Sequence, residues 1–233
     1  MPPRILIVDA EPVVRSGYER LLRREGFQVV VGSSGREGFE LALKETPDLI
    51  ILDPHLPDIN GQDMCQRIRQ TPEVRTIPIL AVSAHVLDGE ATQCLNQGAD
   101  GYLRKPVDGP NLVANVRAML RRPRNYFMEK DVIRKGRISI RVAERRAIFD
   151  RRELPNLTPK EFELLKELVC RSPRYVSKEA LAMKVWGLPF DQVHRRTVDV
   201  HVQRIRRKLG SPASSFLKTV TLVGYRWFPS PNL

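Results

Sequence analysis

The chain has 233 residues, more than a single hydrophobic core usually needs, and this length predicts two compact domains. No run of about 18 apolar residues occurs, and the N-terminus shows no signal-peptide pattern, so we expect a cytoplasmic protein and not a membrane protein. Three widely spaced cysteines predict reduced structural thiols rather than a disulfide framework or a zinc site: Cys65, Cys94 and Cys170.

The net charge of +12 is unevenly distributed along the chain. Residues 1–120 contain 13 Lys and Arg against 16 Asp and Glu, whereas residues 121–233 contain 26 against 11. A basic second half is typical of a module that binds nucleic acid or anionic lipid, because Lys and Arg displace counterions from polyanions. Charge alone does not choose between these two. The basic stretch Arg121–Lys135 indicates a linker, and we predict domains at 1–121 and 136–233 with a linker at 122–135.

Five short apolar runs recur in the first half, and helical patterns lie between them. Continuous apolar runs are typical of parallel strands that are buried on both faces of a sheet. The first half is therefore predicted to be a doubly wound (βα)₅ domain of the α/β class. Its strands are expected at Arg4–Asp9, Gln28–Gly32, Leu49–Asp53, Ile79–Ser83 and Gly101–Lys105.

Four polar residues, Asp9, Asp53, Ser83 and Lys105, each end a different predicted strand. In open α/β sheets ligands bind beyond the carboxyl ends of the strands, so these side chains are expected to converge. Such a set suits phosphoryl transfer to a carboxylate, in which one Asp attacks while Lys and a hydroxyl hold the phosphoryl oxygens. Taken one at a time, the same residues would equally suit turns, caps or a solvated loop.

Four motifs, VDAEP, LDPHLPDING, AVSA and GYLRKP, occur in the order and at the spacing of bacterial response-regulator receiver domains, and residues 4–121 resemble that family. The resemblance implies that Asp53 accepts a phosphoryl group from a sensor histidine kinase. It also implies that Asp9, Asp53 and the backbone carbonyl of His55 hold Mg²⁺. Lys105 and Ser83 would then bind the phosphoryl group, and Tyr102 would be the switch aromatic.

The sequence departs from this family at the metal site. The family usually carries two adjacent acidic residues after the first strand, but this chain reads Asp9-Ala10-Glu11. A methyl group cannot bind a hard cation. Glu11 is one residue out of register, and it either reaches the metal or simply favours the dipole of the first helix. We therefore hypothesise that Asp53 is a poor phosphoacceptor.

A second departure concerns the face that related DNA-binding regulators use for active homodimers, where ion pairs usually cross the interface. Gly101, Asn111 and Asn115 replace three of those charges. A dimer through this face is expected to depend on packing more than on ion pairs, because the residues that remain are Asp100, Arg117, Leu112, Val116 and Met119.

The second half predicts an α+β domain. Residues 136–154 alternate apolar and basic positions, which indicates a small antiparallel sheet. Thr158 to Glu161 matches a capping box at the start of a helix, and Ser177 is placed to cap a second helix that ends at Gly187. A third helix follows, and Phe216 to Phe228 is predicted to form two short strands around a turn.

The third helix has the sequence RRTVDVHVQRIRRKLG. Val198, Val202, Ile205 and Leu209 recur at helical spacing and are predicted to face the core. The opposite face and its flanks are predicted to point outward, and they carry groups that suit base edges, thymine methyls and phosphates: Arg196, Asp199, Val200, Gln203, Arg204 and Arg207. A solvated charged face would be the simpler interpretation of an isolated helix, but two preceding helices favour a DNA-binding role.

Residues 136–228 resemble the winged helix-turn-helix domain of the OmpR/PhoB family through LTPKEFELL, KVWG, RRTVDVHVQRIRRKLG and VGYRW. The resemblance implies that the third helix enters the major groove of double-stranded DNA, that the hairpin reaches a minor groove, and that Gly187–His194 faces RNA polymerase. It places Asp199, Val200, Gln203 and Arg204 at bases. It places Arg196, Thr197, His201 and Arg206 at phosphates, and the other expected DNA contacts are Arg195, Arg207, Thr221 and Arg226.

Together these patterns predict a sequence-specific DNA-binding transcriptional regulator of a two-component phosphorelay, acting as a homodimer on DNA. The alternative is a phosphorylation-independent regulator whose receiver binds a partner protein or a small ligand. An enzyme acting on phosphate esters is not expected, because the acidic cluster is incomplete and no base or leaving-group acid is present at the site.

Overall fold

The computed structural model describes residues 1–84, 89–121 and 132–229 of the chain. These form two compact units, Met1–Arg122 and Pro123–Leu233, each of which has its own core. Residues 122–131 of the predicted linker lie outside the described part of the chain. Residues 132–135 do not belong to a linker, because they form a strand that pairs with its neighbour in an antiparallel sheet.

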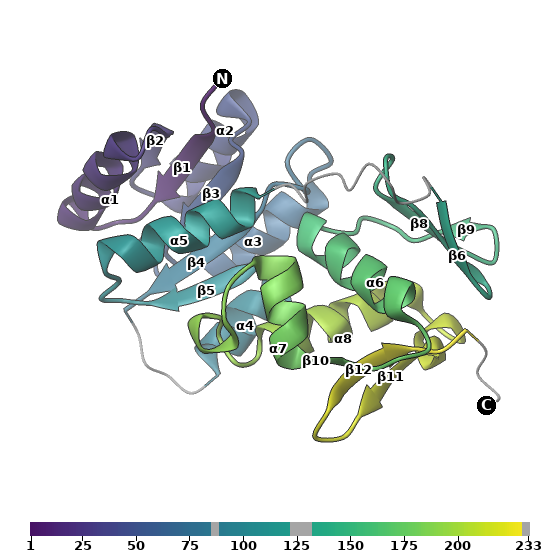
Figure 1. Cartoon of the computed structure of the whole chain (residues 1–233). Helices are drawn as coiled ribbons and strands as arrows, with labels where there is room; N and C mark the ends of the chain where they lie inside the picture. Colours follow the sequence, from purple (N-terminus) through teal and green to yellow (C-terminus); the bar gives the residue numbers. More distant parts are fainter. Residues whose placement is uncertain (85–88, 122–131, 230–233) are drawn as a thin grey trace. The chain divides into compact units, whose positions relative to one another are not determined.

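The N-terminal unit is built on a parallel sheet of five strands in the order β2-β1-β3-β4-β5. Its central strands are buried along their whole length, which explains why their sequences are continuously apolar. The predicted α/β doubly wound fold is confirmed (Figure 1). The strands are β1 (Arg4–Val8), β2 (Gln28–Gly32), β3 (Leu49–Leu52), β4 (Ile79–Ser83) and β5 (Gly101–Arg104).

Helices cover both faces of this sheet. Helices α1 (Pro12–Arg24) and α5 (Gly109–Leu120) pack together on one face. Helices α2 (Gly35–Glu45), α3 (Gly61–Gln70) and α4 (Glu90–Gln97) follow one another on the other face. Gly38 in α2 allows close approach to β1, because a Cβ there would lie 2.6 Å from a methyl group of Val8.

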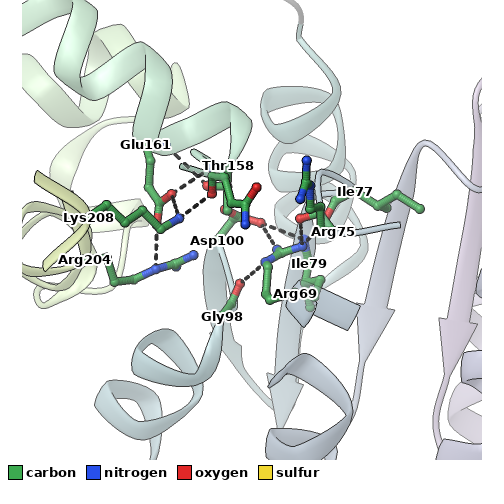
Figure 2. A network of polar contacts seen from close by, with 11 residues as sticks. Arg69, Arg75, Ile77, Ile79, Gly98, Asp100, Thr158, Glu161, Arg204 and Lys208 are labelled. Atoms are coloured by element: carbon green, nitrogen blue, oxygen red, sulfur yellow. Dashed lines mark hydrogen bonds and ion pairs between the residues drawn. The ribbon is translucent and has the colours of Figure 1, made fainter. Parts of the chain in front are cut away.

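The packing of α5 contradicts the expected apolar dimer face. Leu112, Val116 and Met119 all lie in the core of the N-terminal unit, at no more than 6% exposure, and are therefore unavailable to a second subunit. Asp100 is fully buried as well, where its carboxylate accepts hydrogen bonds from Arg69 Nη2 at 2.6 Å and from the backbone N–H of Ile79 at 3.0 Å (Figure 2).

The C-terminal unit begins with an antiparallel sheet of four strands, β6 (Val132–Lys135), β7 (Ile138–Arg141), β8 (Arg146–Phe149) and β9 (Arg152–Glu153). Helix α6 (Pro159–Arg171) follows, and strand β10 (Val176–Ser177) leads into α7 (Lys178–Leu181), which continues as a π-helical turn over Ala182–Trp186. After a 3₁₀ turn at Phe190–Gln192, the long helix α8 covers Thr197–Leu209. A further 3₁₀ turn at Ala213–Phe216 precedes the hairpin of β11 (Leu217–Val220) and β12 (Gly224–Trp227) (Figure 1).

Local signals in the sequence account for these helix boundaries. Both halves of the predicted capping box are present, since the Thr158 hydroxyl accepts from Glu161 N–H and the Glu161 carboxylate accepts from Thr158 N–H. Ser177 caps α7, and Gly187 ends the π-helical turn in a left-handed conformation with φ of 70°. The four predicted core residues of α8 are at most 4% exposed, which confirms the apolar stripe of that helix.

Candidate functional site

Three of the four predicted strand-end residues meet at the carboxyl edge of the N-terminal sheet. Asp9 follows β1, Asp53 follows the neighbouring strand β3, and Lys105 follows β5. The ammonium nitrogen of Lys105 lies 2.7 Å from Asp9 Oδ2 and 2.5 Å from Asp53 Oδ2. All three side chains are less than one tenth exposed. A single buried cation therefore bridges two carboxylates.

Backbone donors fix the second oxygen of each carboxylate. Asp9 Oδ1 accepts from the N–H of Glu11 at 2.9 Å, and Asp53 Oδ1 accepts from the N–H of His55 at 2.7 Å. Burial alone would lower the pKa of Lys105, but its hydrogen bonds to Asp53 and Asp9 outweigh burial and raise the pKa above its ordinary value of 10.5. Lys105 therefore remains charged and neutralises part of the acidic pair.

An open cavity of about 470 Å³ is lined by Ala10, which stands next to Asp9 where the family usually has an acid, and by Pro54 and His55, which follow Asp53. The Glu11 side chain is 63% exposed, and its Oε1 is 3.9 Å from the Lys105 nitrogen. Asp58 also borders the cavity, but its carboxylate accepts from the N–H groups of Gly35 and Arg36. Those backbone bonds, chiefly that from Arg36, lower the pKa of Asp58 to about 2.

The carboxylates of Asp9 and Asp53 and the backbone carbonyl of His55 would be enough protein ligands for Mg²⁺, because this ion keeps several water ligands. Asp9 and Asp53 face a common point, as their shared contact with Lys105 shows. In the described residues no three His, Cys, Asp or Glu side chains are grouped in a metal-binding arrangement. The residues present therefore fit Mg²⁺ with two carboxylate ligands and without the third acidic group that is usual in receiver domains.

Ser83 and Tyr102, the predicted switch residues, contact a residue that the sequence did not single out. Glu90, at the start of α4, accepts a hydrogen bond from Ser83 Oγ at 2.8 Å and one from the Tyr102 hydroxyl at 3.4 Å. His55 Nε2 lies 2.5 Å from the same carboxylate. Burial and the charge of Glu90 raise the pKa of Tyr102 to about 12. In the sequence Glu90 is indistinguishable from any acidic residue in the first turn of a helix.

The structure sorts the predicted DNA contacts by exposure. Four of those on or next to α8 are exposed and available to a ligand: Arg195, Arg196, Gln203 and Arg207. Asp199 and Arg206 are half-buried. Thr197, Val200, His201 and Arg204 are all buried, at no more than 5% exposure. The expectation that Val200 and Arg204 lie on the outward face of α8 is therefore wrong, and the side chains of Thr197 and His201, which were expected near phosphates, are not exposed.

Internal contacts explain the burial of His201 and Arg204. His201 Nδ1 lies 2.8 Å from the carbonyl oxygen of Thr197, and its ring packs edge-on against Trp186. Arg204 Nε forms an ion pair with Glu161 Oε1 at 2.7 Å, while Lys208 Nζ contacts Glu161 Oε2 at 2.5 Å (Figure 2). Two cations of α8 are thus attached to one fully buried carboxylate of α6.

The half-buried residues of α8 connect this helix to its surroundings. Asp199 accepts from Lys178 Nζ at 2.9 Å and from the Tyr225 hydroxyl at 2.7 Å. Arg206 donates from Nη2 to the carbonyl oxygen of Leu217 and to the Thr219 hydroxyl, each at 2.8 Å. These bonds orient the hairpin relative to α8.

The hairpin of β11 and β12 carries both polar and apolar side chains at its tip. Thr221, one of the predicted contacts, is exposed, whereas Arg226 is half-buried, with its guanidinium 4.1 Å from the centre of the Phe228 ring. Leu222 is fully exposed at the tip, in the left-handed region with φ of 62°. The hairpin therefore offers a polar and an apolar side chain where the family commonly has Arg-Gly.

Comparison with known proteins finds a family match in each half of the chain. Residues 5–117 match the response regulator receiver domain, and residues 152–227 match the C-terminal domain of transcriptional regulatory proteins. The alkaline phosphatase synthesis transcriptional regulatory protein SphR of Synechococcus elongatus is 39% identical over 96% of this chain and 90% of its own. The phosphate regulon transcriptional regulatory protein PhoB of Rhizobium meliloti is 37% identical over 97% of this chain and 98% of its own.

A solved structure of a RitR mutant, in which an aspartate replaces a cysteine, covers 97% of this chain and 98% of its own at 28% identity, with a TM-score of 0.72. In the described ranges, with gaps at 85–88, 122–131 and 230–233, no helix combines the length and hydropathy that a membrane span requires. Both domain matches and the full-length relatives lead to one assignment. The chain belongs to the OmpR/PhoB-type response regulators of two-component systems, in which a receiver domain is joined to a winged-helix DNA-binding domain that regulates transcription.

Proposed function

We propose that this protein is a cytoplasmic, sequence-specific regulator of transcription whose receiver accepts a phosphoryl group on Asp53 from a sensor histidine kinase. The observation that supports this most directly is the Lys105 ammonium group, which contacts Asp9 and Asp53 together. A buried cation at this point suits a site that receives additional negative charge.

In the proposed reaction, an Asp53 carboxylate oxygen attacks the phosphorus atom of a phosphohistidine. The new O–P bond forms as the P–N bond breaks, and the departing imidazole nitrogen keeps the electron pair of that bond. Lys105 moves with the new charge and binds a phosphoryl oxygen, as does the Ser83 hydroxyl. Mg²⁺, held by Asp9, Asp53 and the His55 carbonyl, would supply electrostatic shielding of the phosphoryl oxygens.

Ala10 makes this reaction slow in our proposal, because it leaves the metal with one acidic ligand fewer. The test is incubation with Mg²⁺ and acetyl phosphate, followed by intact-mass measurement of the wild type, Ala10→Asp and Asp53→Ala. We expect slow and partial gain of one phosphoryl group in the wild type, faster gain in Ala10→Asp, and none in Asp53→Ala. Rapid and complete modification of the wild type would contradict the effect of Ala10, and modification of Asp53→Ala would exclude Asp53.

The C-terminal domain is proposed to place α8 in the major groove and the hairpin in an adjoining minor groove. Support comes from the exposed polar and basic side chains on and beside α8, Arg195, Arg196, Gln203 and Arg207. Binding as a homodimer to tandem half-sites, and contact of Gly187–His194 with RNA polymerase, belong to the same proposal. The charges of this set give general affinity, and Gln203 supplies an amide that can read a base edge.

A second candidate function is favoured by Ala10: regulation that does not depend on phosphorylation. Genome-wide DNA occupancy of the wild type and of Asp53→Ala separates the two functions. Equal occupancy of the same sites would select phosphorylation-independent regulation, and loss of occupancy in Asp53→Ala would select the phosphorelay.

A further inference from the structure

Glu90 is a buried carboxylate at the centre of the switch residues of the receiver. It is 7% exposed, although it is the first residue of helix α4. Its Oε1 accepts from the Ser83 hydroxyl at 2.8 Å and lies 2.5 Å from His55 Nε2, while Oε2 accepts from the Tyr102 hydroxyl at 3.4 Å. One carboxylate thus contacts three side chains from three different parts of the chain.

The same three residues surround the proposed phosphoryl site. Ser83 is the hydroxyl that would bind the phosphoryl group, and Tyr102 is the aromatic that would follow it inward. His55 connects the two sites, because its backbone N–H donates to Asp53 Oδ1 while its imidazole contacts Glu90. Asp53 and Glu90 are therefore attached to opposite ends of one residue.

We propose that Glu90 is an internal competitor of the phosphoryl group: its carboxylate holds Ser83 and Tyr102 when Asp53 is unmodified and must release Ser83 when Asp53 is phosphorylated. This inference rests on the proposed role of Asp53. It makes Glu90 a positioning residue, since it acts on the reacting group through Ser83 and His55.

The competition follows from the chemistry of a hydroxyl group. Ser83 Oγ carries one proton and donates to one acceptor at a time, so a hydrogen bond to Glu90 and one to a phosphoryl oxygen exclude each other. A carboxylate and a phosphoryl group are both anionic acceptors of strong hydrogen bonds, so Glu90 competes with the phosphoryl oxygen on comparable terms. The Tyr102 hydroxyl donates to the other oxygen of the same carboxylate, Glu90 Oε2, at 3.4 Å.

The negative charge of Glu90 also opposes phosphorylation of Asp53. The site already contains the carboxylates of Asp9, Asp53 and Glu90, and Lys105 contacts only the first two of them in its ion pairs. An aspartyl phosphate carries roughly two negative charges where the Asp53 carboxylate carried one, so phosphorylation adds about one negative charge close to this group. Removing the charge of Glu90 should therefore favour phosphorylation as well as free the Ser83 hydroxyl.

The test compares full-length Glu90→Gln and Glu90→Ala with the wild type. Gln keeps the shape and one acceptor oxygen, and Ala removes the contact altogether. Glu73→Gln is the matched control, because Glu73 is an exposed acid of the same domain. Thermal unfolding of each variant establishes that the receiver is folded. The protein is labelled with 3-fluorotyrosine, and the ¹⁹F signal of Tyr102 is assigned by its loss in Tyr102→Phe.

We expect the Tyr102 signal to shift in Glu90→Ala without any phosphodonor, to shift less in Glu90→Gln, and to stay in place in Glu73→Gln. With acetyl phosphate and Mg²⁺, the initial rate of phosphorylation should rise roughly tenfold in Glu90→Ala, which is the lower range for loss of a charged hydrogen bond.

Two results would overturn the inference: an unchanged Tyr102 signal in both Glu90 variants, or phosphorylation that is measurable and equally fast in the wild type and Glu90→Ala. If no variant gains a phosphoryl group while the Tyr102 signal shifts, the role of Asp53 is refuted and the hold of Glu90 on the switch residues is supported. The two proposals therefore fail in distinguishable ways.

Discussion

Replacing Glu161 by Gln should destabilise the DNA-binding domain through the loss of one charge. Glu161 is fully buried and contacts Arg204 and Lys208, and Gln preserves its volume and an acceptor for the Thr158 N–H. The substitution leaves the Arg204 guanidinium, whose side chain is 6% exposed, without its carboxylate. Breaking a buried ion pair in this way costs about 3–5 kcal/mol. Lys208, at 24% side-chain exposure, can turn to water and should add little.

Urea unfolding followed by tryptophan fluorescence measures this cost in the full-length chain. Both tryptophans, Trp186 and Trp227, lie in the C-terminal unit, so the signal reports on that unit alone. The double substitution Glu161→Leu with Arg204→Met removes both charges and should recover most of the lost stability, because apolar replacement of a buried pair is often neutral. A cost below about 1 kcal/mol for Glu161→Gln, a value typical of exposed pairs, would refute the reasoning.

The same pair predicts a pH dependence. Burial alone would raise the pKa of Glu161, but Arg204 and Lys208 outweigh burial and lower the pKa below its ordinary value of 4.5. A carboxyl whose pKa is lowered by folding contributes stability that is complete above the unfolded pKa and is lost as the pH falls through the folded pKa. The stability difference between wild type and Glu161→Gln should therefore be constant above pH 4.5 and shrink below it.

Three further results are expected. Gln203→Ala should change base preference at one position of the DNA site by about 1–3 kcal/mol. Arg207→Ala should instead weaken binding to all sequences and reduce the slope of affinity against salt concentration by about one, as measured by fluorescence anisotropy over a salt series. Equal losses on all sequences for both variants would contradict these roles. Gly61→Ala should lower the melting temperature of the receiver, because the new Cβ would lie 2.5 Å from the Cα of Pro54. An unchanged melting temperature by calorimetry would show that the backbone around Pro54 shifts at little cost. The Asp58 carboxyl should titrate near pH 2 in an NMR titration, because backbone N–H groups, chiefly that of Arg36, stabilise its charged form. A midpoint near 3.8 would show that those hydrogen bonds are absent in solution.

Much of the fold could be predicted from the sequence because its signals are local. The strand runs end one residue before Asp9, Asp53 and Lys105, and the rule that ligands bind at the carboxyl edge of a parallel sheet was enough to bring these three together. The Thr158 capping box and the apolar stripe of α8 are likewise patterns within a few residues of one another. The resemblance to the family came from the order and spacing of the sequence motifs.

Other features depended on which elements pack together, and periodicity contains no information about that. An outward position on a helix becomes a core position when another element covers it, as happened to Arg204 beneath α6 and to Met119 against the sheet. Glu90 looks like an ordinary first-turn acid until the fold brings Ser83, Tyr102 and His55 to it. The sequence by itself determined the two domains and the acidic pair, because local patterns encode them; only the tertiary structure decided which charges are exposed, because burial is a property of residues distant in sequence.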